Sequence, residues 1–342
     1  HKILLLGGAG FIGHNLAIHL KKLSPNIFVL DNLMFNSLID NVYDWKNNLN
    51  QTKLYRNFLM QRFDLMRKAK IQMINADARN INDMNRIFHE IKPTKIIHLC
   101  AISSAIKARQ NPTLCFDLQL NTLKNSLELC RQNLKSINQF MFISSSTVYG
   151  DFESSEVDEN TRPKPKGIYA NTKYMGERLV RVYNNQYGLG TTIIRPSALY
   201  GERCVSQRVS QLFIENALLG KKLNLEGGGD GRLDFTYIDD LVDGIIRSLA
   251  FHKGPNTSQT FNITYGNSRT IKELSDIIKD QIPSVKCNIT SRVKDKPIRG
   301  TLSTKRAEEI LKFKSKWPLK TGYKKYIKWY IKEWKDTLRK KK

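Results

Sequence analysis

The sequence predicts an α/β protein in which a doubly wound parallel sheet is joined to a smaller C-terminal α/β domain. Short apolar runs recur along the chain up to residue 264, with helical stretches between them. The first run leads directly into a glycine cluster that opens a helical stretch, and after Pro196 the regular alternation fades. Strands of a parallel sheet are buried on both faces and therefore appear as continuous apolar runs, which is the pattern found here.

The expected strands are the apolar runs at residues 2–6, 27–30, 71–75, 95–99, 139–144, 191–195 and 260–264. We expect residues 1–200 to form the sheet domain, with the strand near 260–264 returning to it. Residues 201–342 are expected to form mainly the second domain.

Two segments outside these strands are predicted to be helical. The polar stretch 32–70 contains Trp45, Tyr55 and Phe58, and we expect an inserted helix there because structureless segments of that length are uncommon. Segment 322–342 has apolar side chains at three- and four-residue spacing, which predicts a helix with one face toward the core. These side chains are Tyr323, Tyr326, Ile327, Tyr330 and Trp334.

The composition excludes several classes of protein. Forty per cent of the 342 residues are hydrophobic, which is enough to bury a large core and excludes intrinsic disorder. No run of 18 apolar residues is present, and the first apolar run is too short for a signal peptide. The five cysteines are widely spaced, so neither a disulfide framework nor a metal site is expected. We therefore expect a protein of a reducing compartment, the cytoplasm.

The chain is strongly basic, with 56 Lys and Arg against 31 Asp and Glu and a formal net charge of +25. Residues 301–342 contribute 15 basic and 4 acidic side chains, a net of 15 − 4 = +11. Such a charge attracts polyanions. We interpret it as a solvated surface without a nucleic-acid partner, and a non-catalytic RNA-binding protein stays as a remote alternative.

The glycine cluster predicts a phosphate-binding turn. Gly7, Gly10 and Gly13 satisfy G-x-x-G-x-x-G, and Gly8, Gly10 and Gly13 satisfy G-x-G-x-x-G. Glycines in these positions allow a tight turn and let backbone N–H groups approach a pyrophosphate. The helix N-terminus that follows favours negative charge. The turn predicts a Rossmann-type dinucleotide-binding domain.

An acidic residue indicates which dinucleotide is bound. Asp31 follows Gly13 by 18 residues and stands at the tip of the second expected strand. A carboxylate there accepts hydrogen bonds from the ribose hydroxyls and repels a 2′-phosphate. Neither Asn32 nor Leu33 supplies an arginine for that phosphate, so NAD is favoured over NADP.

Two further segments carry reactive groups. The hydroxyl cluster 144–147, which includes Ser145 and Thr147, follows the fifth expected strand, and Tyr169 and Lys173 form a Y-x-x-x-K pattern. Residues four apart share a helix face. A nearby ammonium, together with an oxidised nicotinamide, is expected to lower the pKa of Tyr169 and so favour its phenolate. A hydroxyl from Ser145 would hold the substrate oxygen against the phenol.

With these motifs in order, the sequence resembles the extended short-chain dehydrogenase/reductase family, in particular its nucleotide-sugar epimerases and dehydratases. The resemblance runs nearly end to end and rests on residues 7–13, Asp31, Asp77, 97–101, 144–150, 169–173, 195–201, 234–240 and 299–302. It implies an NAD-binding Rossmann domain and a C-terminal domain for a nucleoside-diphosphate sugar.

The resemblance also implies roles for individual residues. Tyr169 would be the catalytic base, Lys173 its activator and a ribose ligand, and Ser145 the aligned hydroxyl, assisted by Thr147. Asp77 would contact the adenine, and a helix N-cap is the alternative interpretation of its position. The implied cofactor-binding residues are Gly7, Gly10, Phe11, Ile12, Gly13, Asp31, Asn32, Asp77, Ala78, Cys100, Ala101, Tyr169 and Lys173.

The hydroxyl cluster favours one branch of the family. The 4,6-dehydratases and the decarboxylases carry carboxylates where this chain has Ser146 and Thr147. Dehydration requires an acid and a base beyond the tyrosine, so the sequence resembles the 4-epimerases. We expect C4 epimerisation of a UDP-hexose or UDP-hexuronate through a transient 4-keto sugar, with NAD regenerated in each cycle. A dehydrogenase, reductase or 4,6-dehydratase on the same scaffold is the alternative.

The substrate side departs from the family pattern at Ala198 and Leu233. With Ser145, Arg232 and Arg299 are the expected substrate-binding residues, since guanidinium groups bind phosphate oxygens in a bidentate manner. Four other cations are weaker candidates for the same role, and we interpret them as solvated charges: Lys107, Arg109, Arg203 and Arg208. The resemblance further implies a homodimer that forms through helices near residues 114–134 and 169–187.

Overall fold

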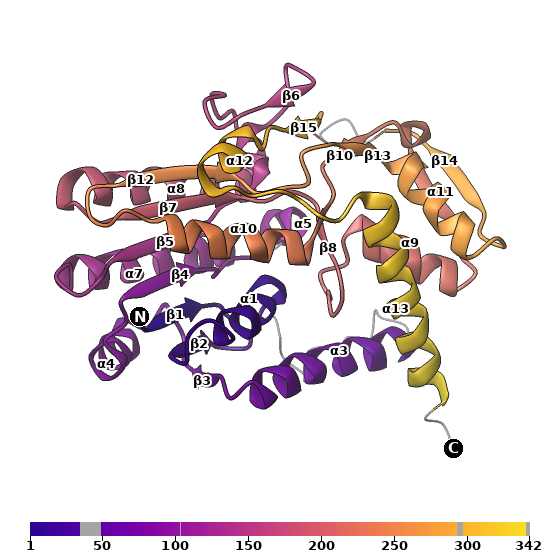
Figure 1. Ribbon diagram of the computed structural model, residues 1–342. Coiled ribbons are helices and arrows are strands. Elements are labelled where there is room, and N and C mark those ends of the chain that lie inside the picture. The colour runs from indigo at the N-terminus through magenta and orange to yellow at the C-terminus, as the bar shows by residue number, and fades with distance from the viewer. Residues whose placement is uncertain (35–48, 103, 293–296, 340–342) are drawn as a thin grey trace.

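The centre of the protein is a parallel sheet of seven strands in the order β12-β7-β5-β4-β1-β2-β3 (Figure 1). The computed structural model describes residues 1–34, 49–102, 104–292 and 297–339. The strands are β1 (Ile3–Leu6), β2 (Ile27–Asp31), β3 (Gln72–Asn75), β4 (Lys95–His98), β5 (Gln139–Ile143), β7 (Thr191–Arg195) and β12 (Ser258–Asn262). All neighbours pair in parallel, so the predicted doubly wound α/β sheet is confirmed.

The two faces of the sheet form separate apolar cores because successive strand residues point in opposite directions. In β1, Leu5 belongs to the core under one face, whereas Leu4 and Leu6 belong to the core under the other. The first core is covered by α1 (Phe11–Lys21) and α10 (Ile238–Phe251). The second is covered by α4 (Ile81–Ile91), α7 (Thr122–Gln132) and α8 (Gly167–Tyr187). This double burial explains the uninterrupted apolar strands in the sequence.

Local signals fix where several helices begin and end. The Asn80 side chain accepts hydrogen bonds from the N–H groups of Asn82 and Asp83 at the start of α4. Helix α8 ends at Gly188, which adopts the left-handed conformation at φ 72° that glycine enters without a steric penalty. Helix α11 (Ile271–Gln281) begins with a capping box between Thr270 and Glu273.

The two helices predicted outside the sheet lie against each other. Helix α3 (Leu49–Lys68) buries Tyr55 and Phe58, while Trp45 falls outside the described residues. Helix α13 (Leu319–Arg339) crosses it at the right of Figure 1. The Phe58 and Trp329 rings are 4.7 Å apart between centroids. The predicted stripe of α13 faces the core, since its four tyrosine and isoleucine side chains are fully buried and Trp334 is 8% exposed.

The remaining elements form smaller pairs and connections. Short strands pair as β8 (Leu199–Tyr200) with β11 (Thr236–Tyr237), β9 (Leu223–Glu226) with β14 (Cys287–Thr290), β10 (Arg232–Leu233) with β13 (Arg269–Thr270), and β6 (Glu156–Val157) with β15 (Thr301–Leu302). The other helices are α5 (Ala105–Gln110), α6 (Pro112–Phe116), α9 (Val209–Leu218) and α12 (Lys305–Leu311). Within the described ranges, every helix is too short or too polar to cross a membrane.

Candidate active site

A pocket opens at the carboxyl ends of the sheet strands, where the strand order reverses. Strand β1 pairs with β2 on one side and with β4 on the other, so the connections leave it in opposite directions. Ligands of open α/β sheets bind at such a switch point. The pocket is lined by the turn after β1, the ends of β2 and β4, the segment after β3 and the segment after β8.

The glycine turn after β1 forms the floor of this pocket. Gly7 has φ +74°, and a Cβ atom there would lie 2.9 Å from the Cys100 backbone nitrogen. A Cβ on Gly13 would lie 2.4 Å from the Gly8 carbonyl oxygen, so α1 begins in close contact with the turn. At Gly10, which lines the pocket, the nearest atom to a Cβ would be 3.4 Å away. The turn fits a dinucleotide, because its backbone lies open to a pyrophosphate at the start of α1.

Asp31 and Asp77 place two carboxylates at the far end of the pocket. Asp31 is 7% exposed and accepts hydrogen bonds from the N–H groups of Ala9 at 3.0 Å and Leu33 at 2.8 Å. Burial raises the pKa of Asp31 above its ordinary value, and these hydrogen bonds oppose the shift. Asp77 pairs with Arg79 at 2.6 Å, which lowers the pKa of this carboxyl to about 2.

The surroundings of Asp77 also decide its structural role. Asn32 donates a hydrogen bond from Nδ2 to Asp77 Oδ2 at 3.0 Å, which joins the ends of β2 and β3. Helix α4 is capped by Asn80. The alternative interpretation of Asp77 as a helix N-cap is therefore wrong, and its carboxylate lies on the pocket wall.

The structure brings together all the predicted cofactor-binding residues of the glycine turn and the strand ends. Those that line the pocket are Gly7, Gly10, Phe11, Ile12, Gly13, Asp31, Asn32, Asp77, Ala78, Cys100 and Ala101. Tyr169 and Lys173 do not line it directly. They lie on α8 next to the hydroxyl cluster that follows β5.

The hydroxyl cluster and the tyrosine lie together. The Ser145 side chain accepts hydrogen bonds from the Thr147 N–H at 3.2 Å and from Thr147 Oγ1 at 3.0 Å. The Ser145 side chain also lies close enough to Tyr169 to lower the pKa of the tyrosine. Tyr169 and Lys173 are one helical turn apart on α8, as their spacing predicts. The group can hold a hydroxyl oxygen of a substrate and exchange its proton.

The electrostatics of Tyr169 depend on its burial. Burial raises its pKa above the ordinary value, and the opposing groups are Arg208, the Ser145 side chain and Arg299. Lys173 donates a hydrogen bond from Nζ to the Ile143 carbonyl at 2.8 Å, and burial lowers the pKa of this lysine to about 8. Desolvation dominates the pKa of Tyr169, and two arginines are among the groups that oppose it. The expected effect of Lys173 together with an oxidised nicotinamide stays a prediction.

The two arginines expected to bind a diphosphate lie in different surroundings. Arg299 donates a hydrogen bond from Nη2 to Ser146 Oγ at 2.6 Å, and its guanidinium carbon lies 5.2 Å from the Phe152 ring centroid. Arg232 is exposed and donates to the Ser268 hydroxyl at 3.1 Å and to the Ser268 carbonyl at 2.8 Å. Arg299 thus contacts the hydroxyl cluster directly, whereas Arg232 lies on β10 outside it.

The interpretation of the other cations as solvated charges is wrong in two cases. Arg208 lines the pocket and is the first group that opposes the raised pKa of Tyr169. Arg203 donates to His14 Nε2 at 3.2 Å and to Asn15 Oδ1 at 3.3 Å, so it fastens the segment after β8 to α1. Lys107 is exposed on the pocket wall, and Arg109 is exposed on the same short helix α5.

Several residues of the pocket carried no clear signal in the sequence. They are Leu30, Arg62, Ala76, Leu99, Ser104, Leu118, Thr122, Val205 and Ser206. Leu30, Ala76 and Leu99 adjoin predicted residues at strand ends, so strand boundaries alone could have found them. Arg62 belongs to α3, and only the docking of that helix brings it to the pocket.

The sequence can now be compared with known proteins. A sequence model described as the NAD dependent epimerase/dehydratase family matches residues 3–264. The chain belongs to this family. Its cofactor is therefore NAD, which the residues of the glycine turn and Asp31 fit. The predicted resemblance to nucleotide-sugar epimerases and dehydratases is confirmed at the level of the family.

Relatives and solved structures match this epimerase/dehydratase chain over almost its full length. UDP-glucuronate 4-epimerase 4 of Arabidopsis thaliana is 27% identical over 350 residues, which cover 96% of this chain and 75% of the relative. A crystal structure of UDP-glucuronic acid 4-epimerase from Bacillus cereus, in complex with UDP-glucuronic acid and NAD, has a TM-score of 0.82 and 25% identity. The similarity covers 96% of this chain and 100% of that one.

A more distant structure illustrates the shared fold alone. The dTDP-glucose 4,6-dehydratase DesIV from Streptomyces venezuelae, a double mutant solved with NAD, superimposes with a TM-score of 0.82 at 21% identity. The match covers 97% of each chain. Epimerases and a dehydratase therefore share this architecture, and the side chains around Tyr169 must distinguish the reactions.

Proposed function

We propose that this protein is an NAD-dependent 4-epimerase of a UDP-hexose or UDP-hexuronate. The observation that carries the proposal is the cluster of three hydroxyl-bearing side chains, Ser145, Thr147 and Tyr169, beside the cofactor pocket. Positions 146 and 147 hold hydroxyls where dehydration would need a further acid and base. The 4-epimerases of UDP-glucuronate among the relatives support the choice of nucleotide and of sugar class.

The reaction follows from the geometry of this group. Ser145 and Thr147 bind the C4 hydroxyl, and Tyr169 accepts its proton as the carbonyl forms at C4. NAD, held at the glycine turn and Asp31, would supply the hydride-transfer chemistry at C4 in both directions. The 4-keto sugar then rotates to present its other face, and Tyr169 returns the proton to the C4 oxygen. Proton and hydride are both restored, so the reaction has no net redox change.

Positive charge around Tyr169 assists the proton transfer. Arg208 and Arg299 oppose the effect of burial on the tyrosine pKa, and they thereby stabilise the phenolate that forms when the proton leaves. In this proposal Lys173 binds the cofactor ribose and positions Tyr169, while its hydrogen bond to Ile143 fixes it to the end of β5.

The nucleotide sugar binds between the sheet domain and the segments after residue 200. Arg299 binds the diphosphate, and its hydrogen bond to Ser146 holds its guanidinium next to the hydroxyl cluster. Arg232 is a second diphosphate ligand, supported by its link to the same region: Ser268 accepts from Arg232 and donates its N–H to Thr301 Oγ1 at 3.1 Å.

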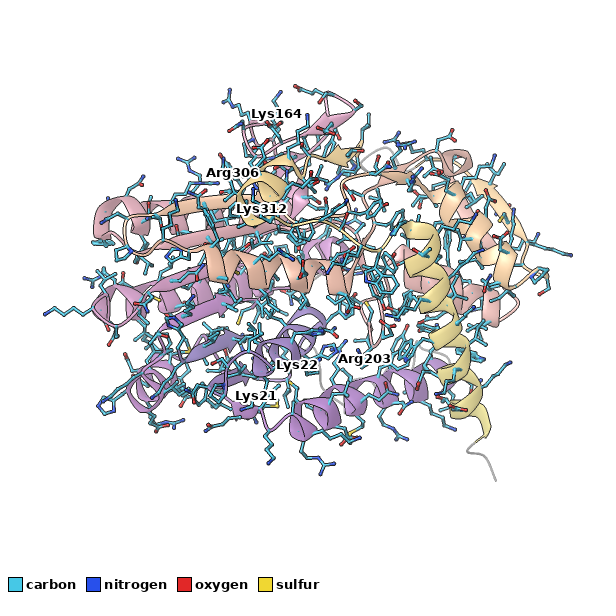
Figure 2. All side chains as sticks on the ribbon, in the orientation of Figure 1. Lys21, Lys22, Lys164, Arg203, Arg306 and Lys312 are labelled. Carbon is cyan, nitrogen blue, oxygen red and sulfur yellow. The ribbon has the colours of Figure 1, made fainter. Side chains whose placement is uncertain are left out.

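The net charge of +25 is the motive for the RNA-binding alternative, and the cations labelled in Figure 2 come from separate elements, such as Lys21 on α1 and Arg306 on α12. The cluster of Ser145, Thr147 and Tyr169 favours the enzyme, because a protein without catalysis has no need of it.

The test is proton NMR of the purified protein in D₂O with a panel of UDP-, GDP-, CDP- and dTDP-sugars and no added cofactor. The proposal predicts the C4 epimer of a UDP-sugar without deuterium incorporation, because the hydride is recycled internally. A keto or deoxy product, or deuterium at C5, would assign the protein to the dehydratases. A stoichiometric change in NADH absorbance would indicate a net dehydrogenase or reductase.

We also propose a homodimer in a reducing compartment such as the cytoplasm. The helix α8 exposes Met175, Leu179 and Val182 at 45%, 36% and 42%. Their spacing puts them on one helix face, which suits an apolar contact between two copies. The five cysteines are free thiols, which supports the compartment. Light scattering after size exclusion tests the dimer, and a monomer of about 40 kDa would refute it.

A further inference from the structure

A second cavity lies at the edge of the sheet, away from the cofactor pocket. It is enclosed by the start of β7, by β12, by the end of α10 and by α12, and its volume is about 280 Å³. Helix α12 lies next to β12, the edge strand, in the upper part of Figure 1. Within the described residues, this edge cavity and the cofactor pocket share no lining residue. A water molecule occupies roughly 30 Å³, so the edge cavity has room for a small organic molecule.

The walls of the edge cavity carry positive charge and no carboxylate. Arg306 on α12 and Lys253 after α10 line it, and among the described residues no Asp or Glu does. His252 also lines it, and burial lowers the pKa of this imidazole, which is therefore neutral at neutral pH. The carbonyl end of α10 would repel an anion, but Lys95 Nζ donates to the Leu249 carbonyl at 2.7 Å and offsets this effect. The edge cavity therefore favours an anion.

Arg306 contributes a guanidinium with an unsatisfied N–H. Its Nη2 donates to Gln259 Oε1 at 2.6 Å, and its guanidinium carbon lies 5.6 Å from the Phe261 ring centroid. Its buried Nε has no hydrogen-bond partner in the part of the chain that the structure describes. Burial raises the pKa of Glu159 and Arg306 is among the groups that oppose the rise, but this carboxylate accepts the Asn262 N–H at 2.6 Å and does not line the cavity. An oxyanion bound against Arg306 would supply the missing acceptor.

Two neutral side chains add donors to the same walls. The Thr192 hydroxyl accepts a hydrogen bond from Gln139 Nε2 at 3.0 Å, so its own proton is left to donate. The Gln259 carboxamide accepts through its oxygen, so its NH₂ group is left to donate. The hydroxyls of Ser248 and Thr257, which also line the cavity, already donate to backbone carbonyls. The available polar groups are therefore two cations and two neutral donors.

We propose that the edge cavity binds a small phosphate monoester, with Arg306 and Lys253 as the cationic ligands of the phosphate and Thr192 and Gln259 as neutral donors. A phosphate monoester carries nearly two negative charges and three strong acceptor oxygens, which match these groups better than the single charge of a carboxylate. Apolar side chains such as Phe251 line the rest of the cavity and suit the organic part of the ligand. The inference does not rest on the proposed 4-epimerase reaction, because no lining residue takes part in it.

The experiment measures binding of ribose 5-phosphate, inorganic phosphate and acetate to the full-length protein by calorimetry at constant ionic strength. We expect ribose 5-phosphate to bind more tightly than the other two probes. Arg306→Gln should weaken its binding by about 10- to 100-fold, the range of a hydrogen bond to a charged group. Lys253→Gln should weaken it by about threefold, because this lysine is exposed. Lys305→Gln, an exposed position on α12, is the matched control and should change it less than twofold.

Three results would overturn the proposal. One is a wild-type protein that does not bind ribose 5-phosphate. Another is an unchanged affinity in Arg306→Gln, which would place the binding at a different site such as the glycine turn. The third is inorganic phosphate or acetate that binds as tightly as ribose 5-phosphate. Thermal unfolding checks that each variant folds. Should Arg306→Gln fail to fold, the exposed Lys253→Gln takes its place, and an unchanged affinity in that variant would refute the proposal.

Discussion

The cofactor half and the substrate half of this site are built in different ways. The cofactor half consists of short segments at the ends of neighbouring strands, such as residues 7–13 and Asp31. The proposed substrate half draws single side chains from distant segments, such as Arg232 on β10 and Arg299 before β15. Contiguous motifs with backbone requirements make the first half readable from sequence, whereas the second depends on how segments pack.

The difference has a physical origin. A glycine turn works through its backbone, so a Cβ atom is excluded wherever the turn contacts its neighbours. Arginine side chains are long and flexible, and several positions can deliver a guanidinium to the same place. The cofactor half should therefore be sensitive to small steric changes and the substrate half to loss of charge.

Tyr169 joins the two halves, and its removal should have the largest effect. We expect Tyr169→Phe to lower kcat by about 10³-fold, the usual contribution of a positioned acid–base group. Binding of NAD should stay within about twofold by calorimetry, because the tyrosine lies outside the pocket wall. If the Tyr169→Phe variant kept its activity, Tyr169 could not be the catalytic base.

Adding one carbon atom at a glycine should destabilise the cofactor half more than the substrate half. In Gly13→Ala the new Cβ would lie 2.4 Å from the Gly8 carbonyl oxygen, so α1 must shift, at a cost of about 3 kcal/mol in the free energy of unfolding. Gly231→Ala in the substrate half is the control, since its nearest atom is 3.9 Å away. Urea denaturation and NAD binding measure both. Equal stability of the two variants would contradict the steric difference.

Loss of a positive charge should impair the substrate half and leave the cofactor half unchanged. We expect Arg299→Ala to raise KM for the nucleotide sugar by about 10- to 100-fold with NAD affinity unchanged, since a charge-assisted hydrogen bond to the diphosphate is lost. Arg232→Ala should raise KM less, because this side chain is exposed. Arg269→Ala, a half-buried arginine on the neighbouring strand β13 that pairs with Glu273, is the control. A larger effect at Arg232 would reverse the assignment.

The smallest expected effect concerns pH. One buried titratable group in each half should change the free energy of unfolding with opposite sign as the pH falls. Burial lowers the pKa of His98, on β4, to about 3. Between pH 6.5 and 3 the unfolded state binds the proton and the folded state does not, so stability falls as pH falls. Burial raises the pKa of Asp234 to about 6. Between pH 6 and 4 the folded state binds that proton first, so this group adds stability as pH falls.

Urea denaturation at pH 7 and pH 5.5 tests the two signs. Because each pH unit is worth about 1.4 kcal/mol per group, wild type should lose about 1 kcal/mol more than His98→Gln over this interval. It should lose slightly less than Asp234→Asn. Identical losses in all three proteins would contradict the assigned signs.

The sequence by itself determined the parts of the protein that act through the backbone or through fixed spacing. The apolar runs predict the strands because both faces of the sheet are buried, and each run lies within two residues of a strand. The glycine turn, Asp31 and the Tyr169 and Lys173 pair follow from motifs that are short and contiguous. Local sterics and helix periodicity are enough to place these groups.

Only the tertiary structure decided which distant side chains complete the site. Arg62 reaches the pocket because α3 docks on α9 and α13, and Arg208 reaches it from the segment after β8, which Arg203 fastens to α1. The raised pKa of Tyr169 is likewise a property of its burial, which spacing to Lys173 does not reveal. Desolvation and long-range packing depend on the whole fold, and no local pattern encodes them.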